Sequence, residues 1–425
     1  MGDKTVIWKT GVPPGHSSPI LVGSRVFLTA VEGETLLTIC LDRATGKILW
    51  RREAPRPRKE SFQKTNSPAA PSPASDGQSV FVFFGDYGIL AYGVDGEDRW
   101  KLPLGPFNNQ NGHGSSPIVT GDLVVLICDQ DTGSYLIAVD KKTGKPRWKV
   151  DRPGILRGYA TPVVWTPAGK PAQLIISGSF ELSSYDLKSG EKLWWVNGMA
   201  WQVKGVPLIA GDTIYVNTWE NGGDFETPPN VDPWETLAAK YDADKDGRLT
   251  AEELKPVFRN GFRDYDLNKD GVMDHQEWDA YIRNKNATNT FLAIKPEGRG
   301  DLTSKVLWKY RKSLPNTASP LLYEGSLFLV KDGGIVTTLD PATGAVQKQG
   351  RIPGATEQFW ASPVGADGKV YMMSQGCKLA VLSAKAQWEV LKVNDLDDEC
   401  FATPAIADKS LYVRTRRWMY RFADK

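Results

Sequence analysis

The sequence predicts an all-β fold: an eight-bladed β-propeller of four-stranded antiparallel blades, with a small α-helical module inserted in the fifth blade. Three observations support this prediction. A Pro-containing segment that leads into a strand-like run recurs eight times, most copies lie near 44 residues apart, and one interval is much longer than the rest. A repeat of this length holds four short strands and is typical of a propeller blade.

The first element of each repeat begins at a proline, as in SPILVGSRVF (18–27) and SPLLYEGSLF (319–328). The eight prolines are Pro19, Pro73, Pro117, Pro162, Pro207, Pro320, Pro363 and Pro404, at intervals of 54, 44, 45, 45, 113, 43 and 41 residues. The chain also contains 41 glycines, 28 prolines and 10% aromatic residues, which favours short strands joined by tight turns.

A second motif closes most repeats. LDRATGKILW (41–50), VDKKTGKPRW (139–148) and YDLKSGEKLW (185–194) match closely, and 93–100 and 339–348 are weaker copies. An Asp followed by Thr-Gly or Ser-Gly predicts a turn between two antiparallel strands. The closing tryptophan is expected to pack between neighbouring sheets.

The last repeat, 403–422, lacks a fourth strand, and the segment VIWKT (6–10) has the sequence of one. We therefore expect the N-terminal strand to complete the last blade. Such an arrangement closes the ring without a free sheet edge.

The long interval of 113 residues exceeds the usual 45 by 68, which predicts an insertion in the fifth blade. Residues 211–218 are predicted as its second strand and 289–295 as its third. The chain is thus divided into a propeller, 1–219 and 289–425, and an inserted module, 220–288. The loop between second and third strands lies on the same face as the segments that enter the first strands, here called the entry face. We expect the module to overhang this face.

The insertion contains two calcium-binding patterns, DADKDGRLTAEE (242–253) and DLNKDGVMDHQE (266–277). Each has oxygen-bearing side chains at loop positions 1, 3, 5, 9 and 12 and a glycine at position 6, which is the EF-hand spacing. The predicted ligands of the two Ca²⁺ sites are Asp242, Asp244, Asp246, the Arg248 carbonyl, Thr250 and Glu253, and Asp266, Asn268, Asp270, the Val272 carbonyl, Asp274 and Glu277. The alternative is a pair of acidic loops without calcium affinity.

The flanks of these loops predict helices. Residues 234–241 carry an apolar face, and Thr250 with Glu253 forms a capping-box pattern that predicts a helix after the first loop. The linking segment 254–265 contains Pro256 and Gly261, so its helices should be short or kinked. His275 occupies a non-ligand position and is expected to be solvated.

The entry loops are polar, which is typical of a ligand funnel at a propeller centre. The cofactor- or ligand-binding candidates are His16, His113, Arg157, Tyr159, Gln202, Lys204, Asn316 and Trp360, joined at the same loops by Asn111 and Glu399. The alternative is that these side chains satisfy one another and hold channel water. The loop 54–73 is a candidate cap for the funnel, or else a solvated surface loop. Asp129 and Asp131 are candidates for the rim, or a chance pair.

The four cysteines form no zinc-binding cluster. Cys377 and Cys400 both fall on the entry face of adjacent blades, so a disulfide between them is one possibility. Cys40 and Cys128 lie in or at the end of predicted strands, which fits buried thiols.

With its Asp-x-x-Thr-Gly-x-x-x-Trp repeats, the chain outside 220–288 resembles the pyrroloquinoline-quinone-like (PQQ-like) β-propeller superfamily. This superfamily includes quinoprotein alcohol dehydrogenases and the propeller lipoprotein of outer-membrane-protein assembly. The whole arrangement resembles bacterial propellers that carry an EF-hand insertion. The resemblance specifies the fold strongly and the activity weakly.

Two main functional hypotheses follow. The first is a calcium-binding extracytoplasmic propeller, a binding or scaffold protein whose small-molecule or protein ligand binds the entry face near the EF-hand module. The second is a PQQ-dependent oxidoreductase of alcohols or sugars, although no catalytic aspartate or PQQ calcium ligand can be assigned and no haem-attachment motif is present. A hydrolase or lyase acting through His16, His113 and Arg157 is a third. Whether the chain is an enzyme stays open, and its catalytic residues are unknown.

Composition limits the partners. The net charge of +2 gives no indication of nucleic-acid binding, and the sequence contains no apolar run of about 18 residues that would predict a transmembrane helix. We expect a monomer. The opening MGDKTVIWKT lacks the apolar core of a signal peptide. An opening of Met-Gly before a strand-like segment is equally compatible with a removed signal, so the N-terminus does not settle the compartment. The resemblance implies a periplasmic or extracellular protein.

Overall fold

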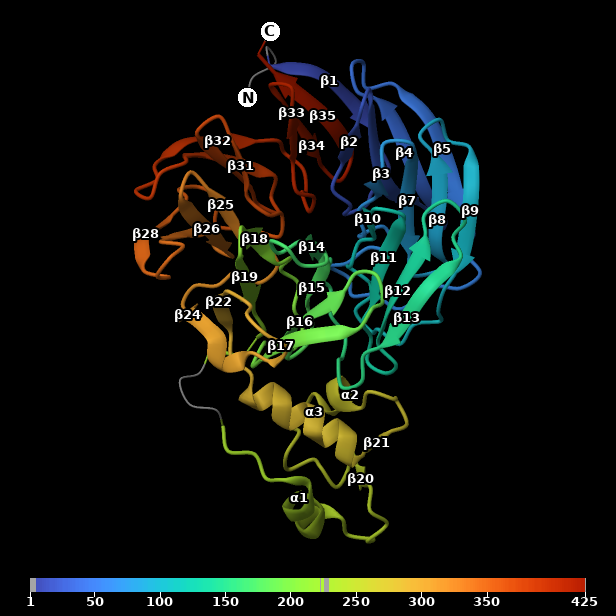
Figure 1. Cartoon of the computed structure of the whole chain (residues 1–425), viewed down its shortest axis with the longest axis vertical. Helices are drawn as coiled ribbons and strands as arrows, with labels where there is room; N and C mark the ends of the chain where they lie inside the picture. Colours follow the sequence, from blue (N-terminus) through green and yellow to red (C-terminus); the bar gives the residue numbers. More distant parts are fainter. Residues whose placement is uncertain (1–4, 222, 225–228, 425) are drawn as a thin grey trace.

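The computed structural model describes residues 5–221, 223–224 and 229–424. Eight sheets form a ring around a central opening, and a small helical module projects from one side of it (Figure 1). The predicted eight-bladed propeller is therefore confirmed. Part of the predicted insertion, residues 222 and 225–228, lies outside the described residues, as do 1–4 and 425.

Within the blades, strands pair antiparallel and in chain order, except that β1 joins blade 8 and the short strand β23 pairs parallel in blade 4. The first four blades contain β2 (Ile20–Val22), β3 (Arg25–Glu32), β4 (Thr35–Asp42) and β5 (Ile48–Ala54); β6 (Ala74–Ser75), β7 (Ser79–Phe84), β8 (Gly88–Gly93) and β9 (Asp98–Pro103); β10 (Ile118–Thr120), β11 (Leu123–Cys128), β12 (Tyr135–Asp140) and β13 (Pro146–Asp151); and β14 (Val163–Trp165), β15 (Gln173–Ser177), β16 (Glu181–Asp186) and β17 (Lys192–Asn197).

Blades 5 to 8 contain β18 (Leu208–Ala210), β19 (Thr213–Thr218), β22 (Thr290–Ile294) and β24 (Val306–Tyr310); β25 (Leu321–Tyr323), β26 (Ser326–Lys331), β27 (Ile335–Leu339) and β28 (Val346–Arg351); β29 (Val364–Ala366), β30 (Lys369–Met373), β31 (Lys378–Ser383) and β32 (Val390–Asp395); and β33 (Ala405–Ala407), β34 (Ser410–Arg414), β35 (Trp418–Ala423) and β1 (Val6–Gly11). In each blade the first strand starts at the residue after the repeat proline.

The predicted ring closure is confirmed. β1 pairs antiparallel with β35 and forms the outer strand of blade 8, with Thr10 opposite Met419 and Gly11 opposite Trp418. The two ends of the described chain consequently lie together in the same sheet (Figure 1).

The hydrophobic core lies between neighbouring blades. One cluster, for example, combines Phe328 and Val336 of blade 6 with Met372 and Leu382 of blade 7, all completely buried. Strands buried on both faces read as continuous apolar runs, which explains why the inner strands do not alternate in polarity.

The Asp-x-x-Thr-Gly motif forms the predicted turns and joins blades as well. In blade 1, Asp42 accepts hydrogen bonds from the backbone N–H and the hydroxyl of Thr45 (2.8 and 2.7 Å). Gly46 has a φ of +74°, and a Cβ there would lie 2.6 Å from the Trp8 ring of blade 8. Trp8 Nε1 in turn donates to the Arg43 carbonyl in the same turn. Of the closing tryptophans of the motif, Trp50 donates to the Val94 carbonyl of blade 2 and Trp148 to the Leu187 carbonyl of blade 4, so the prediction that they pack between sheets is confirmed.

A belt of hydrogen bonds runs around the channel at the residue before each repeat proline. At seven of the eight junctions between blades, the backbone N–H of this residue donates to the hydroxyl of its counterpart in the next blade, at 2.9–3.0 Å. The belt consists of Ser18, Ser72, Ser116, Thr161, Val206, Ser319, Ser362 and Thr403. From blade 4 to blade 5 this hydrogen bond is missing, because Val206 has no hydroxyl to accept from Thr161.

Blade 4 departs from the four-stranded prediction. The short strand β23 (Gly300–Asp301) pairs parallel with β17 and makes its sheet five-stranded. In blade 5 a longer segment with a 3₁₀ turn, Thr303–Lys305, replaces the Thr-Gly turn between β22 and β24. This segment reaches back to blade 4, where the backbone N–H of Leu302 donates to the Trp195 carbonyl.

The inserted module follows β19 and precedes β22, as predicted. It contains α1 (Trp234–Tyr241), α2 (Phe262–Tyr265), α3 (His275–Asn286) and a two-stranded ladder of β20 (Leu249–Thr250) and β21 (Val272–Met273). The ladder joins the two calcium loops. The predicted helix after the first loop is wrong: the capping-box bonds between Thr250 and Glu253 form, but residues 251–257 make turns. Pro256 lacks the N–H that a continuing helix would need.

The module does not cover the mouth of the channel. It extends outward from the ring on the side of blades 4 and 5 (Figure 1). Leu267 and Ala280 of the module pack against Leu156, Phe180 and Trp201, which lie on entry-face loops of the propeller. The expectation that the module overhangs the entry face is therefore corrected: it contacts the outer part of that face only.

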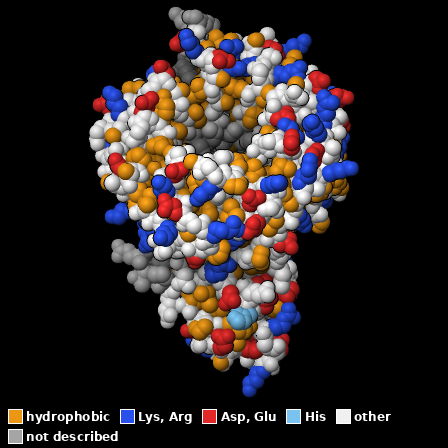
Figure 2. All heavy atoms as spheres, viewed as in Figure 1, with side chains coloured by type: hydrophobic (Ala, Val, Ile, Leu, Met, Phe, Trp, Pro, Cys, Tyr) orange, Lys and Arg blue, Asp and Glu red, His pale blue; other side chains and the backbone are white. Residues whose placement is uncertain are grey.

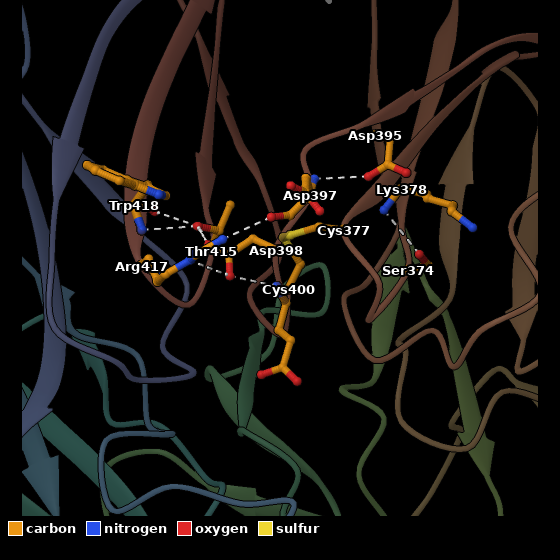
Figure 3. Close-up of a disulfide and its surroundings, with 11 residues drawn as sticks. Ser374, Cys377, Lys378, Asp395, Asp397, Asp398, Cys400, Thr415, Arg417 and Trp418 are labelled. Atoms are coloured by element: carbon orange, nitrogen blue, oxygen red, sulfur yellow. Dashed lines mark hydrogen bonds and ion pairs between the residues drawn. A yellow bond between two sulfur atoms is a disulfide. The ribbon is translucent and has the colours of Figure 1, made fainter.

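The disulfide left open by the sequence forms between Cys377 and Cys400. Cys377 precedes β31 of blade 7, and Cys400 lies in the loop that enters blade 8. Beside the bond, Asp398 accepts from the Thr415 hydroxyl (2.6 Å) and the Arg417 backbone (Figure 3). The bond thus joins two blades on the entry face. Cys40 and Cys128 are buried free thiols, as predicted.

Candidate functional site

The central cavity lies on the entry face, at the axis of the ring. Its volume is about 410 Å³, which lies within the range of small-ligand pockets, and the space-filling view shows the ring hollowed at its centre (Figure 2). The wall consists of His16, Gln63, Thr65, Asn66, Ala70, Asn111, Gly114, Tyr159, Thr161, Gln202, Lys204, Val206, Asn316, Thr317, Ser319, Trp360, Ser362 and Phe401.

One sequence position accounts for a ring of this wall. The third residue before the repeat proline lines the cavity in all eight blades: His16, Ala70, Gly114, Tyr159, Lys204, Thr317, Trp360 and Phe401. Four of these residues, Ala70, Gly114, Thr317 and Phe401, were not among the sequence candidates, although their spacing from the repeat proline was a signal that could have found them. The blades are built alike, so the same position points to the axis each time.

Six of the eight candidates therefore line the cavity. These are His16, Tyr159, Gln202, Lys204, Asn316 and Trp360. Whether they bind a ligand stays a prediction.

His113 and Arg157 lie outside this wall. His113 is buried, with its ring 4.3 Å from the Phe107 ring, and burial together with Arg58 lowers its pKa to about 4. Arg157 is 1% exposed and bonds Asp131 at 2.6 Å. Both side chains therefore occupy packed positions behind the cavity.

Asp129 and Asp131 do not form a charged rim. Both are buried, and each pairs with an arginine: Asp129 with Arg152 at 2.8 Å and Asp131 with Arg157. The guanidinium of Arg157 also lies 4.4 Å from the centre of the Trp201 ring. These pairs brace the loops of blades 3 and 4.

One side of the cavity is aromatic. Phe401 stacks on His16, with ring centres 3.9 Å apart, and contacts Trp360 at 5.4 Å. Burial, with smaller effects of Arg414 and Arg416, lowers the pKa of His16 to about 4, so the ring is neutral at pH 7. Phe401 follows Cys400 directly, and the disulfide fixes its loop. Trp360 Nε1 is buried without a hydrogen-bond partner.

The opposite side carries amides and one cation. Asn111 Nδ2 donates to the Tyr159 hydroxyl (2.8 Å) and to Gln202 Oε1 (3.3 Å). Lys204 Nζ donates to the Gln202 carbonyl and to Asn316 Oδ1, both at 3.1 Å. Burial lowers the pKa of Lys204 to about 8.

The loop 54–73 forms part of the wall through Gln63, Thr65, Asn66 and Ala70. Asn66 Nδ2 donates to the Asn111 carbonyl (2.8 Å), which ties the loop to blade 3. A second hollow of about 450 Å³ lies beside the first and shares His16, Thr65, Asn66 and Phe401 with it. Glu399 lies in this second hollow, paired with Arg416.

The first calcium loop places its carboxylates together. Ligand oxygens of Asp242, Asp244 and Asp246 lie within 4.8 Å of one another. Asp242 accepts from the backbone N–H groups of Lys245 and Gly247, and Glu253 folds back to Ala243 and Thr250. Three converging carboxylates fit a hard cation that prefers oxygen ligands.

The second calcium loop has the same turn and lies deeper. Gly271 donates to Asp266 Oδ2, whereas Asp266 Oδ1 is buried without a hydrogen-bond partner. Glu277 is 3% exposed and accepts from the backbone of Leu267, Asn268 and Asp274. A cation in the loop would satisfy the unpaired oxygen, so these residues also fit calcium.

Side chains around the loops connect them to each other. Arg248 of the first loop pairs with Asp270 of the second at 2.6 Å. His275 is about half exposed and stacks on Trp234, so it is solvated but also packed against α1.

The cavity does not fit a quinone cofactor that brings its own calcium ion. Calcium takes oxygen ligands, with carboxylates prominent among them. Among the described residues that line the cavity, none is an Asp or a Glu. The same described wall also offers no carboxylate that could serve as the general base of an alcohol oxidation.

The ring, its cavity and the inserted loops together define a class: an eight-bladed propeller that carries an EF-hand pair. The family profile described as outer membrane protein assembly factor BamB matches residues 2–227 and 298–419. The chain belongs to this family. The EF-hand profile matches residues 239–257 and 259–280.

Solved structures share the fold. BamB from Moraxella catarrhalis has a TM-score of 0.63 and 10% identity, covering 99% of this chain and 97% of its own. The computationally designed Ika8 protein has a TM-score of 0.59 and 10% identity, covering 99% of both chains. Quinohemoprotein alcohol dehydrogenase from Comamonas testosteroni has a TM-score of 0.53 and 10% identity, covering 98% and 76%. A search of curated proteins finds no match.

Membrane insertion through a helix has no support in the described structure. None of its helices combines the length and the apolar character needed to cross a bilayer.

Proposed function

We propose that this chain is a calcium-binding, extracytoplasmic propeller that acts as a binding protein and holds its ligand in the central cavity. The observation that carries this proposal is the cavity wall, in which eight equivalent positions bring unlike side chains to one axis. If the ring were only a scaffold, these positions would need no variety. His16, Lys204 and Trp360 instead offer a neutral imidazole, a cation and an unpaired indole N–H.

The family and its neighbours support two parts of the proposal. The family is named for an outer-membrane-protein assembly factor, which supports a role in binding a partner. The outer membrane in that name also supports a periplasmic location. The quinoprotein alternative is supported by shared fold alone, and the cavity wall does not favour it.

Calcium is proposed to bind both loops. For the first loop, calcium binding is supported by the carboxylate cluster of Asp242, Asp244 and Asp246. For the second loop, it is supported by the buried, unpaired oxygen of Asp266. A bound calcium ion would neutralise the charge of these converging acidic groups, and the twelve-residue loop would surround the ion.

The ligand proposal is tested by filling the cavity. Thr317 lines the wall and is half-buried, so Thr317→Trp should place an indole in the ligand space. Thr236→Trp makes the same change at an exposed position of α1 and serves as the control. A library of small polar fragments is screened by ligand-observed NMR.

Fragments that bind the unchanged protein should lose binding to Thr317→Trp and keep it with Thr236→Trp. Equal binding to both variants would place the fragments elsewhere and overturn the cavity as the ligand site.

A further inference from the structure

Lys204 is the cation of the cavity wall, and its bonded partners are neutral. Nζ donates to a backbone carbonyl and to the Asn316 amide oxygen. A lysine ammonium has three N–H donors, so these bonds leave one for a further acceptor. The residue is half-buried and contributes to the cavity surface, which leaves the ammonium within reach of a ligand.

The nearest acidic groups do not pair with it. Glu220 and Asp332 act on Lys204 only through their charge. The Glu220 carboxylate accepts from the Trp201 backbone (2.8 Å), and Asp332 accepts from the Phe359 backbone (2.8 Å). A partly desolvated charge without a bonded counter-ion is costly to keep in a fold. An anionic ligand would remove that cost.

The rest of the wall indicates what the anion is attached to. The aromatic side formed by His16, Phe401 and Trp360 is suited to contact with a flat apolar body. Trp360 Nε1 offers an additional unpaired donor. The described wall contains no Asp or Glu, so Glu220 and Asp332, whose charges reach Lys204, lie outside the surface that a ligand would contact.

We infer that the central cavity binds a small ring-bearing carboxylate, with Lys204 as the group that pairs with the carboxylate and the His16–Phe401–Trp360 side as the surface that contacts the ring. This inference rests on the proposed function and adds the class of ligand. The carboxylate forms a charge-assisted hydrogen bond with the free N–H of Lys204, which is among the stronger single polar contacts in proteins.

The test uses a matched pair of probes, 2-naphthoate and 2-naphthamide, which differ in charge and little in shape. Binding to the full chain is measured by calorimetry at pH 7, where the Lys204 ammonium is charged. We expect the carboxylate to bind on the order of tenfold more tightly than the amide. In Lys204→Met the two affinities should become equal, and in Lys312→Met, which alters an exposed lysine outside the wall, the preference should remain.

A second measurement needs no variant. The unchanged protein is acetylated with an amine-selective reagent, and modification of Lys204 and Lys312 is followed by peptide mass spectrometry. Saturating 2-naphthoate should slow the modification of Lys204 at least about fivefold and leave Lys312 unchanged, because an ion-paired ammonium is withdrawn from the reagent.

The outcomes separate the inference from the proposed function. Equal affinity for acid and amide in the unchanged protein, or a preference that survives in Lys204→Met, overturns the carboxylate assignment while a ligand site in the cavity stands. Failure of both probes to bind, with no protection of Lys204, also overturns the assignment. The cavity itself is then judged by the Thr317→Trp comparison.

Discussion

The junction between blades 4 and 5 differs from the other junctions of the ring. Elsewhere a hydroxyl of the belt joins each blade to the next, and at several junctions a tryptophan donates to a turn of its neighbour, as Trp100 does to the Lys141 carbonyl. At the junction of blades 4 and 5 a tryptophan contact is also present, from Trp165 Nε1 to the Gly211 carbonyl (3.1 Å), but Val206 interrupts the belt and β23 adds an extra strand to blade 4. The calcium module is inserted into blade 5 at this same junction.

The difference suggests that inserted segments replace repeat contacts. Leu267 of the second calcium loop packs on Leu156 and Trp201, and the Leu267 carbonyl accepts from Asn108 Nδ2 at 2.7 Å. The equivalent residue of the first loop, Ala243, is exposed. Among the described residues, the second loop is thus the one built into the propeller surface, and we expect the calcium ion proposed for it to stabilise this part of the ring.

The largest expected effect separates the two calcium loops. Glu277→Gln should lower the free energy of unfolding by about 3 kcal/mol in calcium buffer, because it removes the bidentate ligand of the loop that contacts the propeller. Glu253→Gln should have a smaller effect, since its loop faces solvent. Urea unfolding with calcium and with a chelator checks both; equal losses would show that the loops contribute alike.

Next in size is the contact made by Leu267. Leu267→Ala should cost about 2–3 kcal/mol, as other deletions of buried leucine side chains do. Leu249→Ala, within the module's own core, is the control. Hydrogen exchange should accelerate in residues 199–203 of the propeller for Leu267→Ala alone; the same pattern in both variants would argue against a specific interface.

A smaller effect of opposite sign is expected at the interrupted belt. Val206→Thr keeps the shape of the side chain and offers a hydroxyl to the Thr161 N–H. If the junction follows the geometry of the other seven, the protein should gain about 1 kcal/mol. Val206→Ile adds no acceptor and should show no gain. A loss of stability in Val206→Thr would mean that the junction has a different geometry.

Polar contacts at the module interface should contribute least. Asn108→Ala removes the bond to the Leu267 carbonyl, together with an exposed bond to the Thr132 hydroxyl (3.1 Å), and should cost about 1 kcal/mol. Gln110→Ala removes a solvent-facing contact with Asp264 at 3.3 Å and should cost a few tenths. The melting temperature of each variant is measured in calcium buffer. An equal decrease for both variants would show that the Asn108–Leu267 bond contributes no more than the exposed Gln110–Asp264 contact.

These comparisons are sharpest above pH 6.5. The pKa values of His16 and His113 are lowered to about 4 in the folded protein, from 6.5. The unfolded chain therefore binds more protons between these values, and stability should fall as the pH decreases from 6.5 to 4. His113→Phe should reduce this dependence in acid unfolding curves, and an unchanged curve would contradict it.

Sequence was sufficient where a short motif determines the local structure. The repeat prolines and the Asp–Thr turns predicted their places, because each acts within a blade or between adjacent ones. The closing strand 6–10 pairs with residues 418–422, far away in sequence, and was predicted because the last repeat lacked a fourth strand. The two EF-hand loops are equally local, and both form the expected turn at Gly247 and Gly271; which of their oxygens bind calcium stays a prediction.

Sequence failed where packing between distant segments decides. The position of the module depends on Leu267 and Ala280 meeting Phe180, a contact between segments about a hundred residues apart. Arg157 and His113 are polar entry-loop residues like those of the funnel, but their side chains pack behind it, against Asp131 and Phe107. The local sequence does not show these partners. The strand β23 lies in the loop between β22 and β24, and the length of this loop is the one feature of the sequence that indicates it.

The seam between β1 and β35 has a consequence for the order of folding. Val6 lies opposite Phe422, so this pair closes a loop of nearly the whole described chain. Contacts of such long range form late, because the chain must first pay the entropy of closure. β1 therefore stays unpaired until β35 is in place. The other seven blades can form before this pairing, and the ring closes only when β1 pairs with β35.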